Sequence, residues 1–164
     1  MKTSAILSGL LLLAACSSAP RSADASSATE ASASVATTTF PGFKTFSEDG
    51  RLIVFREEDA EAATFLQHRE LGKSVTRIGV GPGGATLRAP DAETIEAFLL
   101  SGKGFVVRLQ EGRLWVFAAN SPEWREFLQH GEPAKSVTRI GAGPDGKTVK
   151  APDAAVLDGW LASR

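Results

Sequence analysis

The chain has 164 residues, of which 43% are hydrophobic and 23% charged, and its formal net charge at pH 7 is −1. A near-neutral chain has no basic excess with which to attract nucleic acid or an acidic lipid surface, so we expect neither kind of charge-driven partner. With one cysteine, the chain cannot form an internal disulfide. Packing must therefore hold the fold together.

The first fifteen residues have the layout of an export signal. Lys2 supplies a positive charge, the run from Ile6 to Ala15 is mostly apolar, and small residues precede Cys16. The run is too short to span a bilayer as a permanent helix. Residues 1–15 are therefore predicted to be a cleaved signal peptide.

The tetrapeptide Leu13-Ala14-Ala15-Cys16 resembles the lipobox of bacterial lipoproteins. This resemblance implies lipidation of the Cys16 sulfur, cleavage before Cys16 and acylation of the new amino group, for example by palmitate, so that the protein is anchored to a membrane. Ser17, at the sorting position, implies the outer membrane rather than the inner membrane of a bacterial cell envelope. The alternative is an ordinary secretory signal with an incidental thiol.

Residues 16–39 are predicted to be a disordered tether behind the lipidated cysteine. Serine, alanine and threonine dominate this segment, and Val35 is its one apolar side chain larger than alanine. Burial of such side chains cannot offset the entropy lost when the chain is ordered.

The remainder of the chain is a tandem repeat with an offset of 62 residues. Residues 42–101 match residues 104–163 at 30 of 60 positions, which predicts two repeats, at residues 40–102 and 103–164. A unit of about 60 residues buries little surface by itself, so we expect the copies to pack on each other.

The first half of each repeat is predicted to be a hairpin followed by a helix, and the second copy shows this most clearly. Residues 105–109 and 113–117 are rich in valine and aromatic residues on either side of a Gly-containing turn. Ser121 and Pro122 then suit the N-cap and first turn of a helix, and Gly131 suits its end.

The second half repeats this order. Residues 137–142 and 148–151 flank a turn that contains proline and glycine, which predicts another hairpin. Asp153 suits the N-cap of a final helix, whose apolar residues recur at helical spacing.

Each repeat is therefore predicted to be ββαββα, an α+β fold. This is the ferredoxin-like order βαββαβ with its last strand moved to the front. We therefore expect a permuted ferredoxin-like unit, in which both helices lie on one face of a four-stranded antiparallel sheet. Two separate sheets, or one sheet completed by the first strand of the second copy, would both satisfy the sequence.

The candidate binding surface consists of two equivalent sets of residues. They are Arg77, Gly79 and Gly81 in the first copy and Arg139, Gly141 and Gly143 in the second. In an extended strand, Arg77 and Gly79 share one face, which would leave room for the guanidinium to bind a carboxylate, a phosphate or a partner side chain. The alternative is an arginine that pairs with a neighbouring acid on a solvated face.

Trp124 is a further candidate binding residue. It stands at the start of a predicted helix, where the first copy has Ala62. A large aromatic side chain at this position could fill the contact between the copies or serve as an anchor for a partner.

No cofactor or metal site is predicted. Pro82 and Pro144 remove an amide from each glycine-rich loop, and a strand follows, so neither loop suits a nucleotide phosphate. His68 and His130 each end a predicted helix, where the helix dipole is a sufficient reason for an imidazole.

No catalytic residue is predicted either. No serine or threonine has the setting of an activated nucleophile. The acidic run at residues 57–59 begins a predicted helix, and the second copy replaces it with the uncharged residues 119–121.

We therefore expect a membrane-anchored cell-envelope lipoprotein that acts as a non-catalytic binding or interaction module for a protein or glycan. A peptidoglycan-binding module is one alternative, by analogy with other envelope domains of similar strand and helix content. A periplasmic enzyme inhibitor, acting through a rigid loop at residues 144–146, and a small enzyme are the others.

Overall fold

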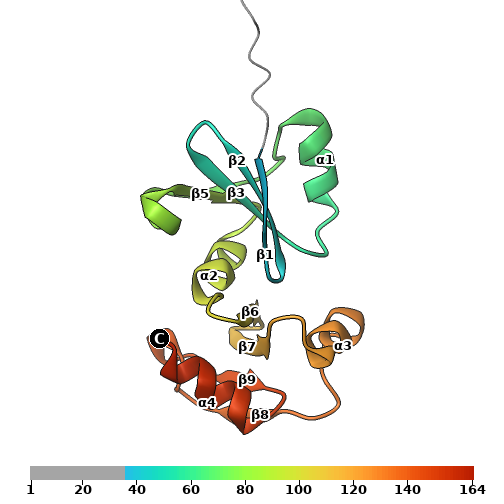
Figure 1. Ribbon diagram of the computed structural model, residues 1–164, viewed down its shortest axis with the longest axis vertical. Helices are drawn as coiled ribbons and strands as arrows, with labels where there is room; N and C mark the ends of the chain where they lie inside the picture. The colour runs from blue at the N-terminus through green and yellow to red at the C-terminus, as the bar shows by residue number, and fades with distance from the viewer. Residues whose placement is uncertain (1–35) are drawn as a thin grey trace, which may run out of the picture. The chain divides into compact units, whose positions relative to one another are not determined.

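The computed structural model describes residues 36–164, so Cys16, the predicted signal peptide and most of the predicted tether lie outside the described residues. The described chain contains two sheets, one for each repeat (Figure 1). None of the helices in this part of the chain is long and apolar enough to cross a membrane.

The first repeat forms a five-stranded sheet in the order β1-β2-β3-β5-β4. Its strands are β1 (Ala36–Phe40), β2 (Phe43–Glu48), β3 (Arg51–Arg56), β4 (Val75–Arg77) and β5 (Thr86–Ala89). Helix α1 (Glu61–His68) follows β3, the short 3-10 turn η1 (Pro82–Gly84) joins β4 to β5, and α2 (Ala92–Leu100) follows β5.

The second repeat forms a four-stranded sheet in the order β6-β7-β9-β8. Its strands are β6 (Phe105–Gln110), β7 (Arg113–Ala118), β8 (Val137–Arg139) and β9 (Val149–Ala151). Helix α3 (Pro122–His130) follows β7, the turn η2 (Pro144–Gly146) joins β8 to β9, and α4 (Ala154–Ala162) ends the repeat.

The predicted α+β class and the order ββαββα are confirmed in both repeats. The predicted capping residues act as expected, since the Ser121 and Asp153 side chains accept hydrogen bonds from the amides of Trp124 and Val156. The choice between one sheet and two is decided in favour of two.

Strand β1 corrects the predicted end of the tether, because residues 36–39 belong to this strand. It pairs antiparallel with β2 from Ala36 opposite Ser47 to Phe40 opposite Phe43. Threonines at residues 37–39 suit extended backbone, and the edge of β2 offers them hydrogen-bond partners that composition does not reveal. The second repeat has only the isolated bridge between Gly102 and Phe105 in this place.

The prediction of antiparallel sheets is wrong for the central pair of strands in each repeat. Strands β3 and β5 run parallel, and so do β7 and β9. Hairpin turns fix the antiparallel pairs, whereas the direction of β4 or β8 depends on the path of the chain after the preceding helix. Since β5 and β9 reverse the direction of β4 and β8, the same path also decides the central pairing.

The prediction that both helices lie on one face of the sheet is also wrong. Phe46 of β2 packs against Phe65 of α1, with ring centroids 5.6 Å apart, whereas Phe43 packs against Phe98 of α2 at 5.4 Å. Successive residues of a strand point to opposite faces, so Phe43 and Phe46 lie on different faces. Helices α1 and α2 therefore cover opposite faces of the first sheet.

The second sheet has the same arrangement, with Phe117 of β7 packed against Phe127 of α3 and the adjacent Val116 clustered with Trp160 of α4. The sequence shows which side of each helix is apolar but not which face of the sheet receives it.

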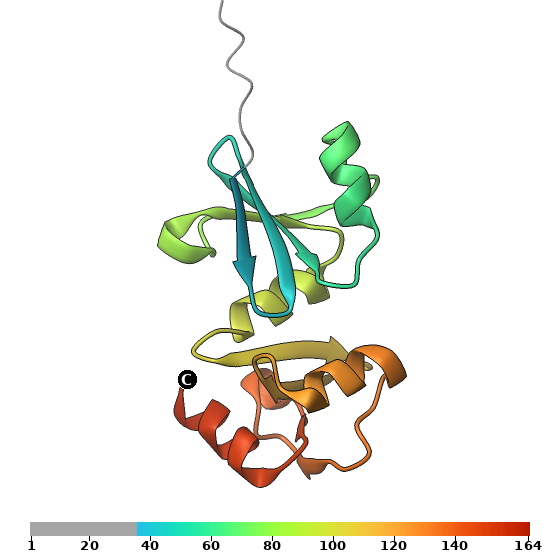
Figure 2. The same ribbon diagram turned by 45° about the vertical axis from the view of Figure 1, so that its right-hand side comes forward.

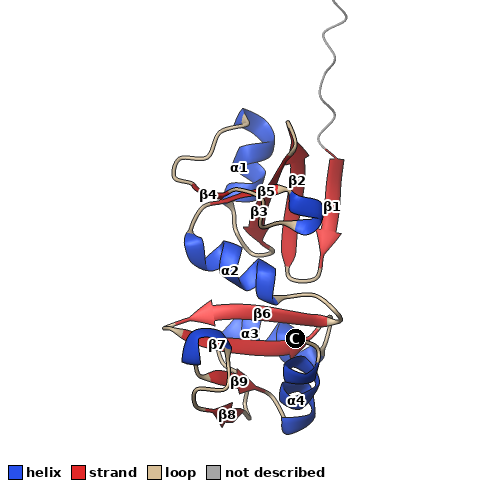
Figure 3. Ribbon diagram, turned by 90° about the vertical axis from the view of Figure 1, so that its left-hand side faces the viewer, coloured by secondary structure: helices blue, strands red, loops and turns tan. Residues whose placement is uncertain are grey.

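The expected packing of the two repeats on each other is confirmed. One continuous core contains Phe43 and Phe98 of the first repeat together with Val106, Phe117 and Trp124 of the second. Helix α2 lies between the first sheet and β6 (Figures 2 and 3). The apolar side chains at this seam are thus shared by both repeats.

The shared core predicts that the repeats unfold together. Ile53→Ala removes a side chain that is 1% exposed and that packs only within the first repeat, and should lower the free energy of unfolding by about 2–5 kcal/mol. All three tryptophans lie in the second repeat. Tryptophan fluorescence therefore reports on the second repeat, whereas circular dichroism reports on both. In Ile53→Ala, the unfolding midpoint should fall by the same amount with either probe.

The matched control is Ile78→Ala, the same change at a side chain that is 84% exposed; it should alter stability by no more than about 0.5 kcal/mol. A fluorescence midpoint in Ile53→Ala equal to that of the wild type would show that the repeats unfold independently.

Candidate functional site

An open groove of equivalent residues occurs in both repeats. The first groove, of about 440 Å³, is lined by Arg51, Ser74, Thr76, Ile78, Thr86 and Arg88. The second groove, of about 310 Å³, is lined by Arg113, Thr138, Ile140, Thr148 and Lys150. Every residue of the second groove corresponds to a residue of the first at the 62-residue offset.

Both grooves lie on the sheet face that carries the first helix of the repeat. In the first repeat, Arg88 is opposite Thr76 on one side and Ile53 on the other, and Ile53 packs in the cluster that contains α1. Cross-strand partners share a face of the sheet, so all three residues lie on the α1 face. The groove occupies the part of this face towards the edge strand β4.

An isoleucine just beyond the edge strand is almost fully exposed in each groove. Ile78 is 84% exposed and Ile140 is 89% exposed. Both occur in the run that is identical between the repeats. A single exposed apolar residue is ordinary, but the same one on both edges, within the same set of hydroxyls and cations, marks an equivalent surface.

The two grooves each have two cations but differ in whether these cations have an acidic partner. Neither Arg51 nor Arg88 forms an ion pair within residues 36–164, and the Arg88 Nε donates a hydrogen bond of 3.1 Å to the Ser74 hydroxyl. In the second groove, the Lys150 ammonium lies 2.8 Å from a Glu132 carboxylate oxygen and 4.0 Å from the Trp115 ring centroid. Arg113 lies 3.9 Å from Glu111. Within the described part of the chain, the cations of the first groove thus have no acidic partner, whereas each cation of the second groove has one within 4 Å.

The predicted arginines lie on the opposite face from the grooves. Arg77 is opposite Leu87 in the sheet, on the α2 face, and is exposed. Arg139 forms an ion pair with Asp158 of α4. The alternative of an arginine paired with a neighbouring acid thus holds for Arg139, while Arg77 has no ion pair in the described part of the chain.

The predicted glycines serve the backbone of the β4–β5 and β8–β9 connections. Gly79 and Gly141 have φ of 72° and 69°, in the left-handed region that glycine tolerates best. A Cβ on Gly81 would lie 2.6 Å from the Leu87 side chain, and one on Gly143 would lie 2.9 Å from Val149. The room expected beside the arginines is therefore absent at Gly81 and Gly143.

Trp124 lies at the seam between the repeats, one of the two places suggested by its sequence position. It is 3% exposed, and the Arg108 guanidinium carbon lies 5.0 Å from its ring centroid. Arg108 also lies over Phe43 of the first repeat at 5.6 Å. A side chain buried in this stack contributes to packing and is not free to anchor a partner.

Arg108 is the seam residue that sequence analysis missed. It is 4% exposed, and its Nη2 is 2.5 Å from a carboxylate oxygen of Glu58 in the first repeat. Burial lowers the pKa of this guanidinium, and Glu58 acts in the opposite direction. Alignment of the two repeats could have identified it, since Arg108 stands where the first repeat has Phe46.

The Arg108–Glu58 pair lies in a polar cleft of about 330 Å³ between the repeats. Its lining combines two arginines with three carboxylates, namely Arg56, Arg108, Glu58, Glu93 and Glu111. Arg56 is itself held by Asp91 at 3.3 Å. Each arginine of this cleft is thus paired with a carboxylate of the first repeat, which indicates a structural ion-pair network. The Arg56 Nε and the Arg108 Nη1 have no hydrogen-bond partner within residues 36–164.

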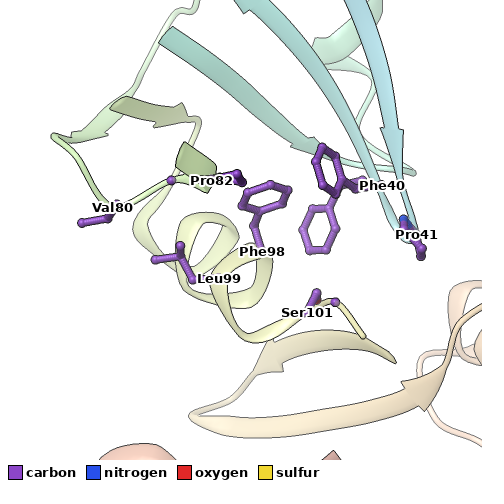
Figure 4. A pocket seen from close by; sticks show the side chains of 10 residues that line it. Phe40, Pro41, Val80, Pro82, Phe98, Leu99 and Ser101 are labelled. Carbon is purple, nitrogen blue, oxygen red and sulfur yellow. The ribbon is translucent and has the colours of Figure 1, made fainter. Parts of the chain in front are cut away.

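An apolar pocket of about 280 Å³ lies in the first repeat beside α2 and η1 (Figure 4). Phe40, Phe98 and Leu99 lie along its walls. Ser101 is the one lining residue with a polar side chain, and its hydroxyl already donates to the Ala97 carbonyl and accepts from the Val107 amide. The pocket therefore has no free side-chain group for catalysis or for orienting a polar ligand.

Neither histidine lies in any of these cavities. His68 and His130 are exposed at the ends of α1 and α3. Within residues 36–164, no group of three His, Cys, Asp or Glu side chains could hold a metal ion.

Comparison of the chain with protein-family models, with curated proteins and with solved structures gave no match. The geometry of the two grooves is therefore the basis on which a function is proposed.

The burial of Arg108 predicts an unequal effect when the two partners of its ion pair are replaced. Glu58→Gln leaves a buried guanidinium without its counter-ion and should cost about 1–3 kcal/mol of stability. Arg108→Met keeps the volume between Phe43 and Trp124 and leaves a half-exposed carboxylate that water can solvate. It should change stability by no more than about 1 kcal/mol. Urea unfolding of the two variants measures both values, and a larger loss in Arg108→Met would contradict the structural role assigned to this pair.

Proposed function

We propose that the protein is a non-catalytic binding protein of the bacterial cell envelope, anchored by lipid on Cys16, whose two grooves contact a protein partner. The observation that carries this proposal is the recurrence of the groove in both repeats with the same exposed isoleucine. The two repeats differ at half of their positions, yet both retain the groove.

The groove combines the features of a protein contact. Burial of an exposed isoleucine contributes about 1.5–3 kcal/mol, and the surrounding threonine hydroxyls and cations supply directional contacts. Strands β4 and β8 are edge strands of their sheets, so a partner strand can hydrogen-bond to their free backbone groups beside the isoleucine.

A protein partner is favoured over a glycan by the kind of side chain that is exposed. In the described part of the chain, the exposed large hydrophobic residues are Leu66, Ile78, Val80, Val137 and Ile140. None of them is aromatic, and Trp115 on the sheet is 5% exposed. A sugar ring would find no exposed aromatic face on which to stack.

A binding role is favoured over catalysis and over inhibition. The grooves are lined by hydroxyls, cations and isoleucine, with no histidine or carboxylate to act as a general base. The loop at residues 144–146, which suggested an inhibitor, is followed by Lys147, whose ammonium lies 2.8 Å from Glu96 of α2. This ion pair holds the loop against the first repeat.

Two grooves on one chain also suit an anchored protein. Once one groove is occupied, binding of the second becomes intramolecular, which raises the overall affinity for a partner with two contact segments. The sequence Leu-Ala-Ala-Cys and the Ser/Ala/Thr-rich segment that follows it support a lipid anchor and a tether.

The proposal predicts that the two isoleucines carry the binding. Crosslinked affinity capture from envelope fractions, with the lipidated protein as bait and a Cys16→Ala control for anchoring, should recover a protein partner. Ile78→Ser or Ile140→Ser should each weaken recovery about tenfold, a loss of about 1.4 kcal/mol, and the double variant should abolish it.

Leu66→Ser is the matched control, because Leu66 is also exposed, at 47%, but lies on α1 outside the groove lining. All variants should unfold at the wild-type temperature. Recovery of the same partner by the double isoleucine variant would refute the proposal, and sedimentation with purified peptidoglycan in its place would favour the glycan-binding alternative.

A further inference from the structure

The first groove has the composition of an oxyanion site. Its lining comprises two guanidinium groups and three hydroxyls, from Arg51, Arg88, Ser74, Thr76 and Thr86, and includes no carboxylate. All five side chains are hydrogen-bond donors, and the two arginines keep their charge at any physiological pH.

The strand register brings these donors together. Arg51 of β3 is opposite Thr86 of β5, and Arg88, two residues further along β5, is opposite Thr76 of β4. The two arginines are thus diagonal neighbours on one face of the sheet, within reach of each other through their long side chains. Their guanidinium groups can approach one oxyanion from two sides, with a threonine hydroxyl beside each.

The acids that lie near the cations of the second groove have no paired counterpart in the first. Glu132 binds Lys150, and Glu111 lies within 4 Å of Arg113. The corresponding acids of the first repeat are Glu70 and Asp49. Neither of them forms an ion pair within residues 36–164. The Arg88 Nε is held by the Ser74 hydroxyl, which leaves the outer nitrogens of this guanidinium available.

We propose that the first groove binds an oxyanion, the carboxylate of an acidic side chain of the partner protein, between Arg51 and Arg88. An apolar residue of the same segment packs on Ile78. The second groove binds a partner segment that has the apolar residue but no acidic residue. This inference rests on the proposed function for the identity of the partner, but the oxyanion site itself stands on the lining of the groove.

Bidentate pairing explains why arginine rather than lysine suits this role. A guanidinium offers two parallel N–H groups to the two oxygens of a carboxylate, whereas an ammonium acts as a point charge. The second groove has Lys150 at the position of Arg88, already in contact with Glu132 and Trp115. The two copies therefore differ at the residue that decides oxyanion binding.

NMR titration tests this inference. The ¹⁵N-labelled protein, residues 16–164 with Cys16→Ala, is titrated with sodium acetate or with inorganic phosphate at constant ionic strength. Amide shifts that saturate are expected at residues 74–78 and 86–88, and not at the equivalent residues 136–140 and 148–150. Stronger saturation by acetate indicates a carboxylate, and stronger saturation by phosphate would overturn that choice of oxyanion.

Matched variants assign the effect to the first groove. Arg88→Gln should remove the saturable shifts, at least a tenfold loss of affinity, whereas Lys150→Gln should leave them unchanged. Glu132→Gln frees Lys150 and should create weak shifts in the second groove. Equal shifts in both grooves of the wild-type protein, or shifts that persist in Arg88→Gln, would overturn the inference.

Failure of this inference can be told apart from failure of the proposed function. Loss of the partner in the isoleucine variants, without saturable acetate or phosphate shifts, would remove the oxyanion site and leave the binding role intact. Saturable shifts that depend on Arg88, with partner recovery unchanged in the isoleucine variants, would leave an oxyanion site whose partner lies elsewhere.

Discussion

The shared apolar core around α2 is the contact on which the rest of the structure depends. A repeat of about 60 residues without a disulfide is marginally stable alone. Here α2 covers its own sheet through Phe98 and also packs on β6 of the second repeat. The Trp160 indole and the Arg164 guanidinium both donate to the Leu100 carbonyl at the end of this helix. Each repeat thereby completes the core of the other.

The divergence of the two copies follows from this shared core. In the first repeat, Phe46 packs near the small Ala62 on a face that only α1 covers. The equivalent pair in the second repeat is Arg108 and Trp124, on a face that meets the first repeat. The large ring has moved from strand to helix, and the strand position carries a cation that reaches Glu58 across the seam.

The grooves of the two copies share the residues that lie towards the sheet edge. Their residues sit towards the edge strands β4 and β8, beyond the first helix of each repeat. Ile78 and Ile140 remain exposed just beyond these strands, whereas Lys150 of the second groove lies on Trp115 of the shared core. Differences there, such as Arg88 against Lys150, keep the charge and alter the hydrogen-bonding geometry.

The sequence by itself determined the elements whose causes are local. Hairpin turns, the caps at Ser121 and Asp153, and the repeat offset are all legible from neighbouring residues, and they account for the order ββαββα. Only the tertiary structure decided the parallel central strands, the placement of the helices on opposite faces and the membership of the grooves. These depend on the path of the chain between distant elements, which no local residue pattern specifies. For the same reason the predicted arginine face and the grooves proved to lie on opposite sides of one sheet, since Thr76 and Arg77 differ by one residue but point to different faces.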